Sequence, residues 1–252
     1  MEPNKTIWIV GGSSGIGLEL VKLCLKNNYN IVVSSRNSLK TKELLDLKNT
    51  LPEQIHILDL DVTNKKDIKE KVKEAWSCFD GIDIWFYNAG SYDVMNIDSW
   101  DSEKFEQMNE VNYLGVTRLM TELIPYFKNS NKGHWVWNSS LSSYFGLPHA
   151  GAYSAPKAAL VNLAQSIQPE LNSLNIKLQI INHGFVKTKL TDKNKFKMPQ
   201  LMEASFTAAK ILKGIENSTS FEIRFPFILS LVLRIINLLP YSLSLALTKR
   251  SM

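Results

Sequence analysis

The stretch that decides the fold runs from Ile7 to Gly17 and reads IWIV-GGSSGIG. Its first four residues form an apolar run typical of a strand, and leucines and valines at helical spacing follow from Leu18 to Leu25. Strand, glycine-rich turn and helix in this order are the context that a dinucleotide-binding turn requires. Glycine permits positive φ and lets backbone N–H groups approach a pyrophosphate, and the helix N-terminus adds favourable partial charge. A purely structural glycine turn is the alternative.

The rest of the chain extends this unit into a sheet. We expect strands at residues 6–10, 30–34, 54–58, 83–87, 133–138, 177–181 and 221–225, with long helices over Phe105–Lys128 and Tyr153–Leu174. Right-handed crossovers then give a single α/β domain of Rossmann type, a doubly wound parallel sheet of about seven strands with helices on both faces. Ligands of such a fold bind outside the carboxyl ends of the strands.

A second set of residues indicates proton transfer. Tyr153 and Lys157 stand four residues apart, so on a helix they share one face. Ser140 lies thirteen residues before the tyrosine. A nearby cation favours phenolate, so we expect Lys157 to lower the pKa of Tyr153 and make it a proton donor or acceptor near neutral pH. The spacing alone is weak, because an exposed helical face produces it too.

With both sets in place, the chain resembles a short-chain dehydrogenase/reductase (SDR) of about this length over residues 5 to 226. Gly11, Gly15 and Gly17 fit the T-G-x-x-x-G-x-G turn of that family, although Val10 stands where threonine is usual. Asp61-Val62 fits the adenine-contacting pair, and Asn88-Ala89-Gly90 fits the N-A-G stretch after the fourth strand.

The resemblance implies a site. Its catalytic tetrad would be Asn112, Ser140, Tyr153 and Lys157. Its cofactor-binding residues would be Gly11, Ser13, Ser14, Gly15, Ile16, Gly17, Ser35, Arg36, Asp61, Val62, Asn88, Ala89, Gly90, Tyr153, Lys157, Gly184, Val186 and Thr188.

Two residues depart from the family pattern. His183 replaces the proline usual before Gly184, which we expect to loosen the loop beside the nicotinamide. Pro156 stands inside the Y-x-x-x-K turn, so the helix should begin close to Ala152.

The end of the second strand indicates the cofactor. Ser35 stands where NAD-selective folds place an acid for the ribose 2′-hydroxyl, and Arg36 follows it. A guanidinium can bind a 2′-phosphate through two charge-assisted hydrogen bonds, whereas a carboxylate would repel it. The family resemblance implies the same, so we expect NADP(H); a surface arginine on a turn is the alternative.

These residues together predict an NADP(H)-dependent oxidoreductase that interconverts a carbonyl and an alcohol by hydride transfer. Tyr153 would be the general acid/base, and Ser140 would stabilise the developing alkoxide. By resemblance, Lys157 would hold the nicotinamide ribose and Asn112 a water that links Lys157 to solvent. A non-catalytic NADP(H)-binding sensor or scaffold is a second hypothesis, against which the intact tetrad argues. A sugar-nucleotide epimerase or dehydratase is a third, for which too little sequence follows the sixth strand.

Composition limits the remaining possibilities. The 252 residues fit one domain, and Cys24 belongs to the apolar face of the first helix, so we expect a buried thiol and a reducing, cytoplasmic setting without a signal peptide. The histidines are scattered without ligand spacing, so no metal site is expected.

The net charge is +5, and lysines alternate from Lys187 to Lys197. A solvated loop, or attraction for an anionic substrate or membrane, would explain them, and nothing indicates nucleic-acid binding.

Residues 227–252 form an apolar extension to the main domain at 1–226. Arg234, Asn237 and Pro240 interrupt it, so two short amphipathic helices are expected instead of a membrane span. They could pack on the cleft, on another subunit, or on a lipid surface with Lys249 and Arg250 at the headgroups. An apolar wall near the cleft favours a lipophilic substrate. Relatives of this type pair through their long helices, which implies a homodimer or homotetramer.

Overall fold

The fold is built on one parallel sheet. The computed structural model describes residues 4–249, so residues 1–3, Arg250 and the last two residues of the expected extension lie outside the described part. The strands are β1 (Thr6–Val10), β2 (Asn30–Ser35), β3 (Ile55–Asp59), β4 (Ile84–Tyr87), β5 (Gly133–Asn138), β6 (Ile176–His183) and β7 (Glu222–Phe225). Their order is β3-β2-β1-β4-β5-β6-β7, and every neighbouring pair is parallel. The predicted strands and the doubly wound topology are confirmed.

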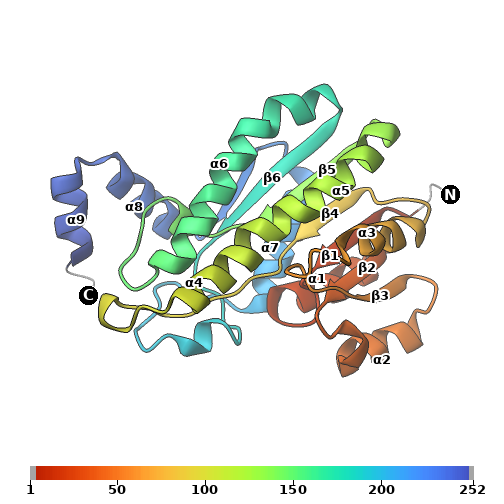
Figure 1. The fold of residues 1–252 in the computed structure, drawn as a ribbon, viewed down its shortest axis with the longest axis horizontal. Coiled ribbons are helices and arrows are strands. Elements are labelled where there is room, and N and C mark those ends of the chain that lie inside the picture. The colour runs from red at the N-terminus through yellow and green to blue at the C-terminus, as the bar shows by residue number, and fades with distance from the viewer. Residues whose placement is uncertain (1–3, 250–252) are drawn as a thin grey trace.

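Helices cover both faces of this sheet. They are α1 (Gly15–Lys26), α2 (Lys42–Thr50), α3 (Ile68–Ser77), α4 (Ser102–Asn109), α5 (Gly115–Ser130), α6 (Gly151–Ser173), α7 (Ala204–Asn217), α8 (Phe227–Leu238) and α9 (Tyr241–Lys249). Figure 1 shows α4, α5 and α6 lying across one face. Side chains of α3, α5 and α6 form the core on that side, and those of α1, α2 and α7 form the core on the other. The strands are consequently buried on both sides, as parallel sheets require.

The helix expected over Phe105–Lys128 is not regular. A π-helical turn, Glu110–Leu114, separates α4 from α5. The hydroxyl of Tyr87 donates a 2.6 Å hydrogen bond to the carbonyl of Val111 in this turn. A Cβ at Gly115 would collide with the Tyr87 hydroxyl and with Val62, so glycine lets the helix approach the sheet here. Single π-turns of this kind are frequent at functional sites, and Asn112 lies in this one.

The apolar segment after β7 forms the two short helices expected on either side of Pro240. In Figure 1 these helices, α8 and α9, project beyond the sheet at the end of the molecule opposite the N-terminus. None of the helices in residues 4–249 combines the length and the hydrophobicity that a membrane crossing requires.

Candidate active site

The glycine-rich turn lies against the end of β4. Gly11 has φ +89°, and a Cβ there would come within 2.5 Å of the backbone nitrogen of Ala89. A Cβ at Gly17 would fall on the carbonyl oxygen of Gly11. The side-chain amide of Asn88 donates a 2.8 Å hydrogen bond to that same carbonyl. The turn therefore requires glycine at these two positions. It also contacts the Asn88-Ala89-Gly90 stretch, and the sequence predicts that both segments bind the same cofactor.

A polar network continues from this turn to α6. Asn138, at the end of β5, donates a 2.8 Å hydrogen bond from its side-chain amide to Asn88. Its backbone carbonyl accepts a 2.8 Å hydrogen bond from Nζ of Lys157, a buried lysine on α6. The Ser139 hydroxyl bonds the backbone carbonyl of Lys157 at 3.1 Å. The ends of β4 and β5, the glycine turn and α6 are thus joined at one edge of the sheet.

Tyr153, Ser140 and Lys157 meet at this edge. Nζ of Lys157 lies 5.7 Å from the centroid of the Tyr153 ring. Burial of the Tyr153 phenol raises its pKa to about 12, and a hydrogen bond with the Ser140 side chain opposes that rise. Burial also lowers the pKa of Lys157 to about 7.

The expectation that Lys157 lowers the pKa of Tyr153 is therefore wrong for this arrangement. Desolvation of the phenol outweighs the other influences on it. Lys157 is itself partly uncharged near neutral pH, and its ammonium is turned toward the carbonyl of Asn138. A phenol held in its protonated form is equipped to donate a proton.

Asn112 braces the loop after β4. It is fully buried, its Oδ1 accepts a 3.0 Å hydrogen bond from the backbone nitrogen of Ser91, and its Nδ2 donates a 2.8 Å bond to the Ser91 carbonyl. Neither side-chain hydrogen bond of Asn112 goes to Lys157. The predicted water link between these two residues stays a prediction.

Other residues predicted to bind the cofactor lie close to the same turn. The methyl group of Thr188 lies 3.0 Å from the Cβ position of Gly15, so the segment after β6 lies over the turn. Val186 is buried and forms a parallel bridge with Met202, which anchors that segment. The N-cap residue of α1, Ser14, makes no side-chain capping bond, which leaves the first N–H groups of the helix to another acceptor.

At the end of β2, the Ser35 hydroxyl lies 2.7 Å from that of Ser38. Arg36 is exposed and forms no ion pair within residues 4–249. Asp61 follows β3 and accepts hydrogen bonds from the backbone and hydroxyl of Thr63, while Val62 beside it is buried. A glycine cradle, an uncapped helix N-terminus and an unpaired arginine fit a dinucleotide that carries a 2′-phosphate.

His183 restrains the segment where proline was expected. Its Nδ1 lies 2.7 Å from the Gly184 carbonyl, and its ring stacks on Phe225 with the centroids 6.4 Å apart. Burial lowers the pKa of His183 to about 4, so the ring is neutral and can donate from Nδ1. The backbone nitrogen of Gly184 also bonds the carbonyl of Phe225 at 2.9 Å. These contacts replace part of the rigidity that a proline would provide.

Pro156 is the sixth residue of α6, which begins at Gly151. The predicted start near Ala152 is confirmed within one residue. The proline lies in the second turn of the helix, however, where its missing N–H removes a helical hydrogen bond to the Ala152 carbonyl.

Apolar and aromatic side chains pack around Tyr153. Met95, Met108 and Ala152 are buried together, and Phe105 and Tyr153 pack against them. Tyr92 meets the Tyr153 ring edge to face, with the centroids 5.1 Å apart. Tyr153 therefore has an apolar wall formed by the loop after β4, by α4 and by the start of α6.

A second cluster ties the loop after β5 to the C-terminal helices. Glu222 of β7 accepts hydrogen bonds from the Tyr144 hydroxyl and from Arg234 of α8. The side-chain amide of Asn182 donates a third, at 2.6 Å, and the Arg234 guanidinium lies 5.0 Å from the centroid of the Tyr144 ring. Arg234, expected only to interrupt an apolar run, fixes α8 to β7 and to the loop after β5.

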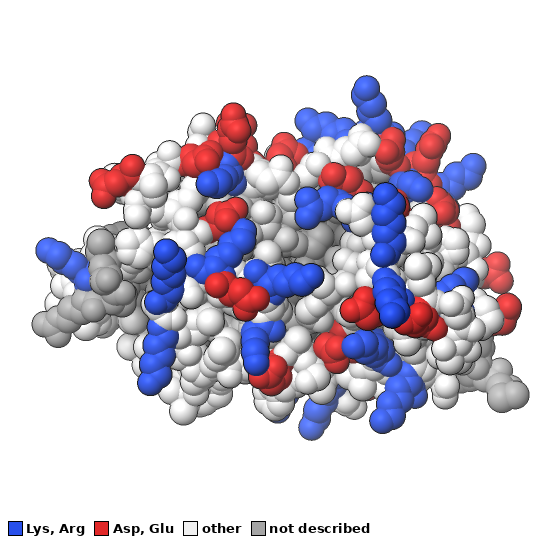
Figure 2. All heavy atoms as spheres, turned by 90° about the horizontal axis from the view of Figure 1, so that it is seen from below, with Lys and Arg blue, Asp and Glu red and all other residues white. Residues whose placement is uncertain are grey.

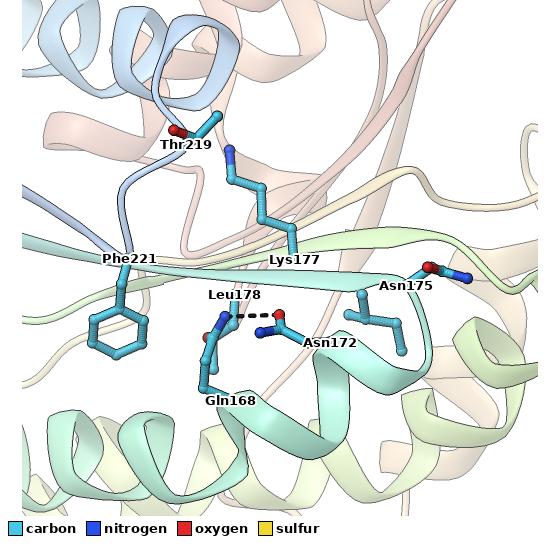
Figure 3. Close-up of a pocket in the computed structure, with 8 residues that line it drawn as sticks. Gln168, Asn172, Asn175, Lys177, Leu178, Thr219 and Phe221 are labelled. Carbon is cyan, nitrogen blue, oxygen red and sulfur yellow. Dashed lines mark hydrogen bonds between the residues drawn. The ribbon is translucent and has the colours of Figure 1, made fainter.

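A shallow groove of about 420 Å³ lies elsewhere, at the amino-terminal edge of β6. Figure 3 shows it between α6, β6 and the segment before β7, with Gln168 donating a hydrogen bond to Asn172 across one wall. Ligands of doubly wound sheets bind at the opposite, carboxyl edge. None of the predicted catalytic residues lines this groove.

Several site residues were not predicted. Asn138 links Asn88 to Lys157, Tyr92 packs on Tyr153, and Glu222 holds Tyr144. The position of Asn138, at the end of an apolar strand and two residues before Ser140, could have indicated it. Tyr92 and Glu222 act through contacts distant in sequence, for which the sequence offers no local signal.

Known proteins share this fold and sequence pattern. The family model of the short chain dehydrogenases matches residues 5–198. An uncharacterized oxidoreductase of Myxococcus xanthus is 28% identical over 98% of this chain and 97% of its own length. The chain therefore belongs to the short-chain dehydrogenase family, a family of oxidoreductases.

Solved structures show the same fold. A short-chain dehydrogenase from Burkholderia cenocepacia in complex with NADP has a TM-score of 0.83 at 18% identity, covering 98% of this chain and 99% of its own. An SDR from Burkholderia phymatum in complex with NAD has a TM-score of 0.81 at 18% identity, covering 92% of each chain.

Proposed function

We propose that this protein is an NADPH-dependent reductase that converts a lipophilic ketone or aldehyde into the alcohol. The observation that carries this proposal is the meeting of Ser140, Tyr153 and Lys157 beside the glycine-rich turn, with the phenol held protonated. A sensor or scaffold that binds the nucleotide without chemistry has no need of this combination.

The choice of NADP(H) rests on charge at the end of β2. Ser35 supplies no carboxylate to oppose a phosphate, and Arg36 is exposed without an ion-pair partner among residues 4–249. A guanidinium in this situation suits bidentate binding of a 2′-phosphate. Fold neighbours have been solved with NADP and with NAD, so it is this residue pair that supports the phosphorylated form.

NADPH would supply the hydride when bound, and the side chains would handle the oxygen of the substrate. Tyr153 donates its phenolic proton to the carbonyl oxygen, and its raised pKa keeps that proton in place at neutral pH. Ser140 hydrogen-bonds the same oxygen and stabilises the charge that develops on it. Lys157 stands next to the phenol and can exchange a proton near pH 7, because its own pKa is lowered to about 7. Asn112 fixes the loop after β4 through its two hydrogen bonds to the Ser91 backbone.

The lipophilic substrate is inferred from the surroundings of Tyr153. Met95 and Met108 are buried beside it, and Leu141 lies directly after Ser140. Leu229 of α8 comes within 3.2 Å of the Cβ position of Gly184, so the extension adds apolar surface at the same edge. Such a wall favours apolar chains or rings attached to the reacting carbonyl.

The test is NADPH oxidation measured over a panel of carbonyl compounds graded by apolar chain length. We expect activity that rises with chain length, and Tyr153→Phe should abolish turnover while NADPH still binds. Ser142→Ala serves as the control, since Ser142 is a buried neighbour with no assigned role. Tyr153→Phe with wild-type turnover on the best substrate would refute the assignment of Tyr153, and preference for short polar substrates would refute the lipophilic class.

A further inference from the structure

The C-terminal arm, defined as α8 and α9 (residues 227–249), exposes an unusual amount of apolar surface. Half of the exposed large apolar side chains of residues 4–249 lie in it: Phe227, Ile228, Leu231, Val232, Ile235, Leu238, Tyr241, Leu243, Leu245 and Leu247. Leu238 is 83% exposed and Tyr241 80%. The surface of a soluble protein rarely carries so many exposed large apolar side chains close together, and a large apolar patch marks an interaction site.

Burial within the arm is the reverse of that in an ordinary amphipathic helix. Ser230, Ser244 and Thr248 are buried along with Leu233, whereas most of the large apolar side chains around them are exposed. The buried hydroxyls bond the helix's own backbone: Ser230 donates to the Phe227 carbonyl at 2.7 Å, and Thr248 to that of Ser244 at 3.1 Å. Small and hydroxyl residues inside with large apolar ones outside is the arrangement of helices surrounded by lipid.

The directions of these side chains show what kind of partner fits. On α8 the exposed residues occupy one face, and the opposite face is fixed to the body by Leu233 and by the ion pair of Arg234 with Glu222. On α9, Tyr241 and Leu245 lie on one side, and Leu243 and Leu247 lie about half a turn away at about 3.6 residues per turn. One flat protein surface would cover only one of these sides, whereas a lipid layer in which α9 is immersed covers both.

The distribution of charge also favours a lipid surface as the partner. No aspartate or glutamate follows Glu222 in the chain, whereas Lys249 ends α9. The backbone N–H of Leu229 donates a 3.1 Å hydrogen bond to Oε1 of Gln200, which places α8 beside the end of the lysine-rich segment Lys187–Lys197. In that segment Lys195 and Lys197 form no ion pair within residues 4–249. Figure 2 shows basic side chains on the face seen from below, several of them between the middle and the left end of the molecule, where α8 and α9 lie in Figure 1.

We propose that the C-terminal arm docks this protein on the surface of an anionic phospholipid bilayer, with the outward faces of α8 and α9 among the acyl chains. The helices have 12 and 9 residues, and spanning a bilayer takes about 20, so the arm lies in the interfacial layer. Apolar burial supplies the attachment, and the lysines beside the arm add attraction for anionic headgroups.

The experiment is flotation of the full-length protein with vesicles of phosphatidylcholine alone or mixed with phosphatidylglycerol, at low salt. The variant is Ile235→Glu, and its matched control is Phe206→Glu on α7, because both side chains are 50% exposed. We expect the wild type and the control to float, more with the anionic vesicles. Ile235→Glu should weaken binding about tenfold or more, the loss expected when one large apolar side chain is not buried.

Circular dichroism and sedimentation velocity without vesicles complete the test. If Ile235→Glu changes the fold, Leu238→Glu takes its place, because its side chain is almost fully exposed. The proposal is overturned if the wild type binds neither kind of vesicle. It is also overturned if the control Phe206→Glu loses as much vesicle binding as Ile235→Glu. A variant that turns a dimer into a monomer also overturns it, because a second copy of the chain would then cover the arm.

Discussion

Lys157→Met should make the protein more stable at neutral pH while it removes a proposed catalytic group. The lysine is buried, and burial lowers its pKa from 10.5 to about 7. At about 1.4 kcal/mol per pH unit, that shift costs the folded state up to about 5 kcal/mol at pH 7. Methionine has a similar length and carries no charge. It loses the hydrogen bond to the Asn138 carbonyl, worth about 1 kcal/mol, so we expect a net gain of up to about 4 kcal/mol.

The sign of the pH dependence follows from proton binding. Between pH 7 and 10.5 the unfolded chain keeps a proton on Lys157 that the folded protein has lost. The free energy of unfolding of the wild type therefore rises with pH across this window, relative to the variant. The advantage of Lys157→Met should be greatest at pH 7 and below, and it should disappear as the pH approaches 10.5.

The assay is urea unfolding followed by tryptophan fluorescence, without added NADPH, at about pH 7, 8.5 and 10. The difference between variant and wild type removes the contribution of other groups that titrate in this range. Lys213→Met, on the exposed face of α7, is the control; it should change stability by less than about 0.5 kcal/mol. If Lys157→Met is less stable than the wild type at pH 7, or if its stability advantage does not depend on pH, then burial does not lower the pKa of Lys157.

Two further changes test the cofactor site. Arg36→Ala should raise the dissociation constant for NADPH about tenfold to a hundredfold, because a hydrogen bond to a charged group is worth about 1.5–3 kcal/mol. The dissociation constant for NADH should stay nearly unchanged. Equal dissociation constants for NADPH and NADH in titrations of the wild type would contradict this prediction. Gly17→Ala should lower the free energy of unfolding by about 1–3 kcal/mol or more, because the added Cβ would fall on the carbonyl oxygen of Gly11. The control is Gly146→Ala, which should leave the free energy of unfolding nearly unchanged because the space around Gly146 is open. Thermal melts of the two variants decide the matter.

The sequence was sufficient for the fold because its signals are local. Each strand is a short apolar run, and the glycine turn directly follows β1, so the position of the cofactor edge could be deduced before any contact was known. Pro240 likewise marked the break between α8 and α9. These features depend on neighbours in the chain, and periodicity and turn chemistry reveal them.

Features that depend on distant contacts could not be deduced. The π-turn around Asn112 arises where Tyr87 and Val62 meet Gly115, which only the folded chain brings together. The pKa of Tyr153 was predicted in the wrong direction, because spacing along a helix says nothing about how deeply a phenol is buried. The contact of Arg234 with Glu222 was missed for the same reason.

The central claim is that hydride reaches a carbonyl carbon while Tyr153 protonates the oxygen. The most direct measurement uses NADPH deuterated at C4 of the nicotinamide, with the best carbonyl from the panel, and mass spectrometry of the alcohol. We expect deuterium on the carbinol carbon with the wild type and no alcohol with Tyr153→Phe, although that variant still binds NADPH. Alcohol without deuterium from either C4-labelled form of NADPH, or labelled alcohol formed at the wild-type rate by Tyr153→Phe, would contradict the mechanism.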